Sequence, residues 1–337
     1  MRSPTRFLAV LAALALVLAA CGDDDASGVA TSGDAAEVDE TSETTEDTAQ
    51  DADEGDEAAF PVTVTVDGTD TTIDAEPQAI VSLSPTATEM LFAVGAGDQV
   101  VAVDELSYFP EEAPVTDLSG FDPNVEAIIG HEPDLVILSG DGNDVVAGLE
   151  AVDVPTLVLP AAMTMDDTYA QIEVVGAATG HVGDAAEVVA GMQSDIDSLV
   201  ADLPERDEPL TYYHELDDTL YSVTSDTFIG EIYALAGLEN VADAADGAAD
   251  SGGYPQLSAE FLVDADPDLV FLADTKCCGQ DASTVGARAG WGEMTAVQQG
   301  NIVELDDDIA SRWGPRIVDF LEAIVAATAE VDAGVAG

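Results

Sequence analysis

Two stretches of this sequence match one another: residues 122–138 (DPNVEAIIGHEPDLVIL) and residues 256–272 (QLSAEFLVDADPDLVFL). Aligned on their shared Pro-Asp-Leu-Val, they lie 134 residues apart, and Glu126 falls on Glu260. Each copy predicts a short helix that carries the glutamate, then an acidic Pro-Asp turn and a buried apolar strand. The chain therefore contains a duplicated α/β unit.

A second repeat in the same order supports this duplication. Residues 89–95 (EMLFAVG) match residues 231–237 (EIYALAG), 142 positions later. Strands alternate with helices in both halves, after a predicted β-hairpin at 62–73 whose turn is Asp67-Gly68. The alternation predicts, in each half, a mostly parallel sheet with helices on both faces. Ligands of such sheets bind beyond the carboxyl ends of the strands.

The composition is strongly acidic. There are 69 Asp and Glu residues against 7 Lys and Arg, which gives a formal charge of −62. A phosphate backbone needs clustered basic residues, so this balance excludes nucleic acid as a partner.

The first 59 residues predict export rather than folded structure. Residues 1–20 have a basic start and a short apolar run, which is typical of a signal peptide. Leu-Ala-Ala before Cys21 resembles the cleavage site of bacterial lipoproteins, in which the cysteine carries the lipid. Residues 22–59 contain 15 Asp or Glu and no Lys or Arg. We expect residues 21–59 to form a disordered acidic tether behind a lipidated Cys21.

Residues 166–204 predict two helices between the halves. A Thr-Gly turn at 179–180 ends the first, and the second carries apolar residues at three-to-four spacing from about residue 184. Twenty helical residues span about 30 Å, which is enough to cross both halves.

Three runs carry a resemblance to a known family: residues 78–105 (QAIVSLSPTATEMLFAVGAGDQVVAVDE), 126–138 (EAIIGHEPDLVIL) and 310–325 (ASRWGPRIVDFLEAIV). Over residues 60–330 the chain resembles the substrate-binding lipoproteins of ABC importers for ferric siderophores, cobalamin and haem. The resemblance implies two Rossmann-like lobes, 60–165 and 205–332, joined by one long helix within 166–204. It also implies a monomer without catalytic activity or cofactor, lipid-anchored on the extracytoplasmic face of the cell membrane.

The resemblance further implies a partner and a cargo. The protein would bind a small-molecule metal chelate between its lobes and deliver it to an ABC permease with its cytoplasmic ATPase. Glu126 and Glu260 match the glutamates that, in this family, form salt bridges to arginines of the permease. The alternative for both is a structural role as first-turn acids that complement the helix dipole.

Candidate ligand-binding residues concentrate in the second half. Four of the basic residues and both tryptophans lie between 276 and 316. Arginine forks bind carboxylate, hydroxamate or catecholate oxygens, and aromatic rings supply apolar area. The predicted set is Arg288, Arg312, Trp291, Trp313, Tyr108, Tyr212, His214 and Tyr221. The alternative is structural, with Arg316 tying down the last helix and Arg288 paired to a carboxylate. On this basis a ferric siderophore is the first choice of cargo, and cobalamin or haem the second.

Cys277 and Cys278 are adjacent, and three interpretations exist for them: a strained vicinal disulfide, a reduced buried pair, or a soft-metal site. We favour the disulfide. Two further functions stay open. One is a receptor for a free transition metal, although only His214 of the three histidines is placed to help. The other is an exported α/β hydrolase, although Gly-x-Ser-x-Gly, His-Glu-x-x-His and phosphate-loop motifs do not occur.

Overall fold

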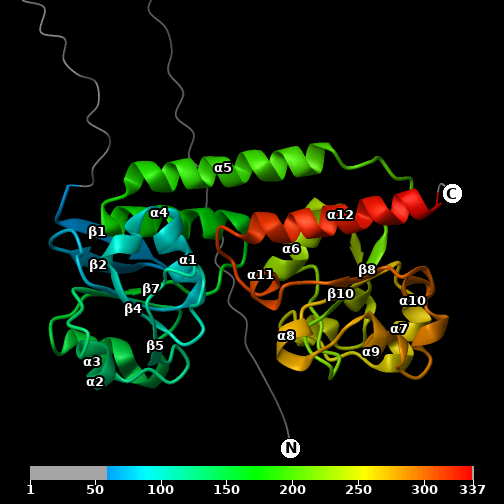
Figure 1. Cartoon of the computed structure of the whole chain (residues 1–337), viewed down its shortest axis with the longest axis horizontal. Coiled ribbons are helices and arrows are strands. Elements are labelled where there is room, and N and C mark those ends of the chain that lie inside the picture. The colour runs from blue at the N-terminus through cyan, green and yellow to red at the C-terminus, as the bar shows by residue number, and fades with distance from the viewer. Residues whose placement is uncertain (1–58, 336–337) are drawn as a thin grey trace, which may run out of the picture. The chain divides into compact units, whose positions relative to one another are not determined.

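A computed structural model describes residues 59–335 (Figure 1). The predicted signal peptide, Cys21 and nearly all of the acidic tether lie outside the described residues. The described chain begins with the predicted hairpin, β1 (Val62–Val66) and β2 (Thr69–Ile73), which pair antiparallel. Asp67 and Gly68 connect the strands with φ of 49° and 78°, the left-handed conformation that two-residue hairpin turns require.

The first lobe is built on a five-stranded sheet in the order β5-β4-β3-β6-β7, and all neighbouring strands are parallel. Alternate residues face opposite sides, so Val81 packs in the cluster under α2 and α3 while Ile80 packs in the cluster that includes α1. The elements are β3 (Ile80–Leu83), β4 (Val100–Asp104), β5 (Val115–Leu118), β6 (Leu135–Leu138), β7 (Thr156–Val158), α1 (Pro85–Ala93), α2 (Val125–Ile129) and α3 (Val145–Glu150).

The second lobe repeats this plan with a four-stranded parallel sheet in the order β11-β10-β8-β9. Its strands are β8 (Thr211–Glu215), β9 (Glu239–Asn240), β10 (Leu269–Leu272) and β11 (Ile302–Glu304). Its helices are α6 (Phe228–Leu235), α7 (Ala259–Ala265), α8 (Thr275–Cys278), α9 (Ala282–Gly286), α10 (Thr295–Gln299), α11 (Asp307–Ala310) and α12 (Ile317–Val335). Short 3₁₀ helices occupy Ala96–Gln99, Gly142–Asp144, Val241–Ala244, Ala248–Asp250 and Trp291–Glu293.

Two helices lie in the chain between the two sheets. Helix α4 (Met165–Thr179) starts at a capping box between Thr164 and Asp167 and ends at Gly180, whose φ is 91°. Helix α5 (Val182–Ala201) then packs against α4 at one end and against α12 at the other, and both lie beneath α5 in Figure 1. A single apolar cluster includes residues of both sheets and of α4, α5 and α12, so the lobes share one core.

The duplicated Pro-Asp turn has a structural purpose. The Asp134 carboxylate accepts the N–H groups of Gln78 and Ala79, at 2.8 and 2.9 Å, just before β3. In the second copy, Asp268 accepts the N–H and the hydroxyl of Thr211, at 2.8 and 2.9 Å, at the start of β8. Each aspartate thus satisfies the backbone where the adjacent parallel strand begins.

None of the helices within residues 59–335 is both long enough and apolar enough to cross a membrane.

Candidate functional site: the junction between the lobes

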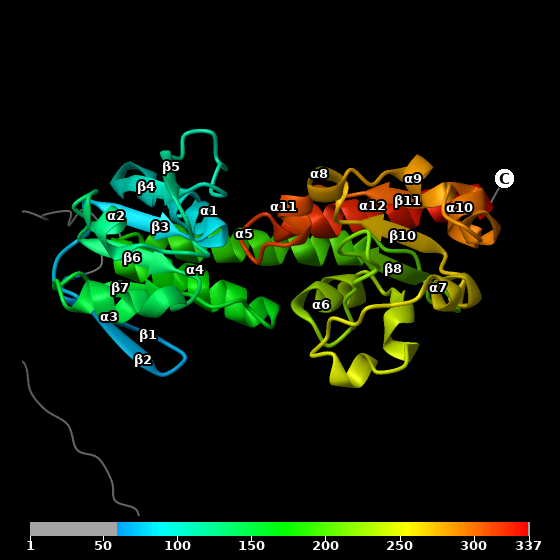
Figure 2. The same ribbon diagram turned by 90° about the horizontal axis from the view of Figure 1, so that it is seen from below.

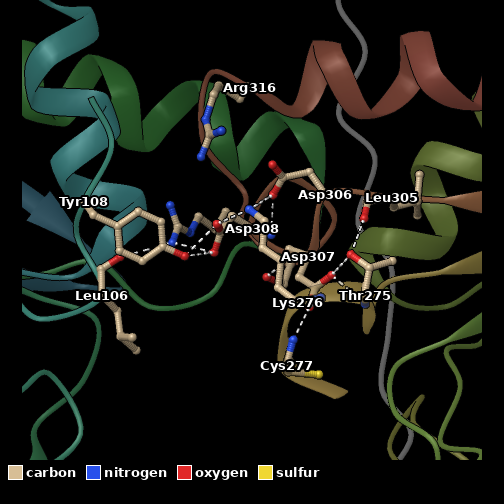
Figure 3. A network of polar contacts seen from close by, with 12 residues as sticks. Leu106, Tyr108, Thr275, Lys276, Cys277, Leu305, Asp306, Asp307, Asp308 and Arg316 are labelled. Carbon is tan, nitrogen blue, oxygen red and sulfur yellow. Dashed lines mark hydrogen bonds and ion pairs between the residues drawn. The ribbon is translucent and has the colours of Figure 1, made fainter. Parts of the chain in front are cut away.

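The carboxyl edges of the two sheets meet at the junction between the lobes. Tyr108 follows β4 of the first lobe, and its hydroxyl donates to both carboxylate oxygens of Asp308, at 2.7 and 2.6 Å. Asp308 follows β11 of the second lobe (Figure 3). Loops that follow strands in both sheets therefore contact each other, which is where ligands of parallel α/β sheets bind.

A network of charges extends from this contact into the second lobe. The Lys276 ammonium binds Asp306 and Asp308, at 2.6 and 2.7 Å (Figure 3). Partial burial opposes ionisation of Asp308, but its hydrogen bonds from Lys276 and Tyr108 and the charge of Arg312 hold its pKa below the usual value. Burial and the bond to Asp308 raise the pKa of Tyr108, so this hydroxyl keeps its proton.

Glu89 of α1 links the two lobes more strongly. Its carboxylate accepts a bond of 2.7 Å from Arg312 and bonds of 2.9 and 2.5 Å from Arg316. Arg312 also donates to the carbonyl of Leu106 at 3.1 Å, and the Arg316 guanidinium lies 3.9 Å from the ring centre of Phe109. The Glu89 side chain is only 2% exposed, so this is a buried ion pair between the lobes.

Exposed apolar side chains also follow strands at the carboxyl edges of the two sheets. After β5, Phe121 is 85% exposed, and after β7, Met163 is 62% exposed. The remaining exposed apolar residues that follow β4 or β8 are Leu106, Tyr108, Phe109 and Tyr221. Apolar side chains left in water at the ligand edge of a fold are available for binding. Phe121 is not among the residues predicted from the sequence, because Val115–Leu118 mixes polar and apolar residues and does not indicate a strand.

The structure brings together only part of the predicted ligand set. Tyr108 and Arg312 meet at the junction. The indole of Trp313, the residue after Arg312, donates to Gln171 of α4 at 3.1 Å. Tyr221 is exposed after β8. The other four residues lie in the interior of the second lobe.

Arg288 is one of these four, and it has an internal partner. Its guanidinium makes two bonds of 2.6 Å to Glu215, which is fully buried at the end of β8, and lies 4.5 Å from the ring centre of Trp291. Trp291 itself is fully buried against Tyr213. Burial and the charge of Glu215 also raise the pKa of the neighbouring Asp274 to about 7. The structural alternative for Arg288 therefore holds, and Trp291 is corrected to a core residue.

Tyr212 and His214 are likewise corrected to core residues. Tyr212 is 1% exposed and stacks on Tyr233 with 3.9 Å between ring centres. The His214 ring is fully buried, and its Nδ1 lies 2.8 Å from the Tyr233 hydroxyl. Burial lowers the pKa of His214 to about 3, so the ring is neutral. Tyr212 and His214 lie on the same face of β8, and both side chains point into the lobe. The buried His214 ring is therefore not accessible to a metal ion.

Every Lys and Arg within residues 59–335 forms an ion pair inside the chain. The pairs are Arg206–Asp332, Lys276–Asp306, Lys276–Asp308, Arg288–Glu215, Arg312–Glu89, Arg312–Asp308 and Arg316–Glu89. Because carboxylates of the chain already occupy these cations, a strongly anionic ligand meets no free positive charge in this part of the molecule.

Cys277 and Cys278 are free thiols, and both are exposed. The favoured vicinal disulfide and the reduced buried pair are therefore not what the structure contains. The two residues lie in the helical turn α8, where neighbouring Cα atoms are about 3.8 Å apart. This separation is shorter than the roughly 4.4–6.8 Å that unstrained disulfides span.

This geometry defines a class of protein: two α/β lobes with parallel sheets are joined by a long helix, and the loops after the strands of one lobe face those of the other. The model of the periplasmic binding protein family matches residues 80–309, and the chain belongs to this family of solute-binding proteins. The predicted fold and the resemblance on which it rested are confirmed.

Individual relatives agree with this assignment. The uncharacterized ABC transporter substrate-binding lipoprotein YvrC of Bacillus subtilis is 32% identical over 275 residues, covering 79% of this chain and 84% of the relative. A cobalamin-binding protein of Halobacterium salinarum (strain R1) is 32% identical over 271 residues, covering 77% and 72%. The crystal structure of the haem-binding protein HutB of Vibrio cholerae superposes with a TM-score of 0.66 at 24% identity, covering 74% and 98%.

Proposed function

We propose that this chain is the extracytoplasmic solute-binding component of an ABC importer, and that its cargo is a corrinoid of the cobalamin type. The observation that carries the choice of cargo is the pairing of every described cation with a carboxylate of the chain, while aromatic and aliphatic side chains stay exposed at the junction. A corrinoid offers a large, mostly uncharged surface that such side chains can cover.

A ferric siderophore is the first choice only if arginines are free to hold its anionic oxygens. Glu215 and Glu89 engage Arg288 and Arg312, so this reason for a siderophore is lost. The cobalamin-binding relative supports the same order of preference.

Equilibrium dialysis of the full chain against cyanocobalamin, haem and a ferric hydroxamate siderophore tests the cargo. We expect saturable binding of one cyanocobalamin per chain and weaker binding of the other two. A preference for the siderophore would restore the original order, and no binding of any of the three would overturn the ligand class.

The exposed apolar residues provide a test of the site. In the variant Phe121→Ser with Met163→Ser, we expect cyanocobalamin to bind about 30- to 1,000-fold more weakly, because each side chain contributes about 1–2 kcal/mol of apolar burial, or about 2–4 kcal/mol together. The matched control is Val152→Ser, since Val152 is 47% exposed but lies before β7, at the opposite edge of the sheet. Equal losses in both variants, measured by isothermal calorimetry, would place the ligand elsewhere.

For the partner we propose the docking role of Glu126 and Glu260. Both are exposed in the first turns of equivalent helices, α2 and α7, which lie on the side of the lobes away from α5 (Figures 1 and 2). Asn124 and Ser258 already cap these helices by accepting N–H groups, so neither glutamate is needed as a cap. Two carboxylates, one per lobe, can align the protein on a permease with two basic patches.

Charge reversal tests this role. We expect Glu126→Arg with Glu260→Arg to reduce uptake of labelled cobalamin at least about tenfold by repelling the permease, without weakening ligand affinity in dialysis. The matched control, Glu187→Arg with Asp195→Arg, makes the same charge change on exposed residues of α5. Unchanged uptake in the first variant would remove the docking role, whereas lost ligand affinity would move the glutamates to the ligand site.

The remaining parts of the chain complete the proposal. Residues 1–20 are the signal peptide, and a lipidated Cys21 with the acidic tether to residue 59 holds a monomeric receptor at the outer face of the membrane. The proposed lobes are 60–165 and 205–332, joined by 166–204. The name of the Bacillus relative, a lipoprotein, supports the anchor.

A further inference from the structure

Cys277 and Cys278 occupy a part of the fold that no role described above uses. They end α8, the single helical turn that follows β10 at the carboxyl edge of the second sheet. Both thiols are free and both side chains are exposed. Figure 3 shows Cys277 next to Lys276, the residue that connects α8 to the charge network of the junction.

Asp307 fixes the backbone that carries this pair. The Asp307 carboxylate accepts the N–H groups of Thr275, Lys276 and Cys277, each at 2.9 Å, together with the Thr275 hydroxyl at 2.8 Å. Four bonds from one side chain hold a turn of only four residues, which Gly279 ends with a φ of 65°. The thiols are therefore presented from an anchored support rather than from a loose loop.

The support also reaches the first lobe. Lys276 binds the same Asp308 carboxylate that accepts the Tyr108 hydroxyl, so α8 and the exposed β4 loop are joined through one side chain. The thiols consequently belong to the strand-end loops that face the proposed cargo. Thiol sulfur is a soft ligand that binds transition metals after losing its proton.

We propose that the Cys277–Cys278 pair supplies a sulfur ligand to the metal at the centre of the cargo chelate. This inference rests on the proposed function, and it concerns cargo whose metal has an exchangeable axial position. With a cobalt(III) corrinoid that carries water, the cobalt–oxygen bond breaks and a cobalt–sulfur bond forms. Water leaves, the thiol proton passes to solvent, and cobalt stays in the +3 state, so no electrons are exchanged.

Visible absorption spectroscopy with two corrinoids tests the proposal. The full chain carries a third cysteine, so all variants are made in a Cys21→Ser background. We expect aquacobalamin to change its spectrum on binding, to saturate at one equivalent and to release about one proton per molecule bound. Cyanocobalamin, whose axial cyanide does not exchange with a thiol under these conditions, should bind without this change.

Substitution of the thiols supplies the decisive comparison. In Cys277→Ser with Cys278→Ser, we expect the spectral change to disappear and the preference for aquacobalamin over cyanocobalamin to fall at least about tenfold, as for loss of one metal ligand. The single variants identify the sulfur that binds. A spectral change that persists in the double variant, or that grows slowly without saturating, would overturn the thiol ligand but not the proposed function. Failure of both corrinoids to bind would overturn the proposed function as well.

Discussion

Replacement of Arg288 by methionine is expected to lower the free energy of unfolding by about 3–5 kcal/mol, the cost typical of removing one partner of a buried ion pair. The Glu215 side chain is 0% exposed and has Arg288 as its salt-bridge partner. The equally buried Asp274 lies close enough to Glu215 for the two charges to interact. Without the guanidinium, two neighbouring carboxyl groups share a site that excludes water, so at least one must take up a proton or the lobe must open.

The matched control is Arg206→Met. Arg206 makes a similar two-pronged contact with Asp332, at 3.2 and 2.6 Å, but that aspartate is 37% exposed. We expect this variant to lose about 1 kcal/mol or less, since water can solvate the remaining carboxylate. Urea unfolding followed by circular dichroism measures both.

A second change separates lost charge from lost packing. If the cost in Arg288→Met comes from the unpaired carboxylate, adding Glu215→Gln should recover part of the stability, because a neutral amide is cheaper to bury. Equal midpoints for the Arg288 and Arg206 variants, or no recovery, would contradict the assignment of Arg288 as an internal countercharge.

The course of the fold was predictable from the sequence because its signals are local. The apolar runs of the two repeated segments predicted β6 and β10, the Asp67-Gly68 pair predicted the hairpin, and a Thr-Gly turn marked the end of α4. The duplication added the relation between the halves. Strand β5 was missed because Val115–Leu118 (VTDL) mixes polar and apolar residues and pairs with β4 at a register shift.

The site was less predictable because partners distant in sequence decide it. Nothing near Arg288 indicates that Glu215, 73 residues earlier, will occupy its guanidinium, and Arg312 meets Glu89 across 223 residues. Composition identified scarce arginines and tryptophans as binding residues, whereas the folded chain uses them mainly to neutralise its own buried acids and to fill its core. In so acidic a chain, carboxylates of the protein pair with the Lys and Arg side chains of residues 59–335, so these are not free to bind a ligand.

The second large effect is expected at the junction, where Glu89→Gln should destabilise the protein by about 2–4 kcal/mol. Arg316, 17% exposed, loses its ion-pair partner, and Arg312, 9% exposed, keeps only Asp308, so buried positive charge is left without its main counter-charge. The consequence should be local as well as global. Segment 306–316 of the second lobe is held on the first lobe largely through Glu89. In the variant, its amide hydrogens should therefore exchange faster than in the wild type, and the increase should exceed that in β10 or β8.

The internal repeat provides the control for this prediction, because Glu231 is the residue of the second lobe that aligns with Glu89. Glu231 also reaches the other half of the molecule, but its carboxylate accepts only the N–H of Met165, at 3.0 Å, at the start of α4. A single capping bond contributes about 1 kcal/mol, and glutamine keeps an acceptor there, so Glu231→Gln should cost less than that. If both variants lose the same stability, or if exchange in 306–316 stays at the wild-type rate in Glu89→Gln, the two arginines do not hold the lobes together. If only the Glu89 variant changes, the two aligned glutamates differ in strength: Glu231 contributes one hydrogen bond at the start of α4, whereas Glu89 holds the two lobes together through ion pairs with Arg312 and Arg316.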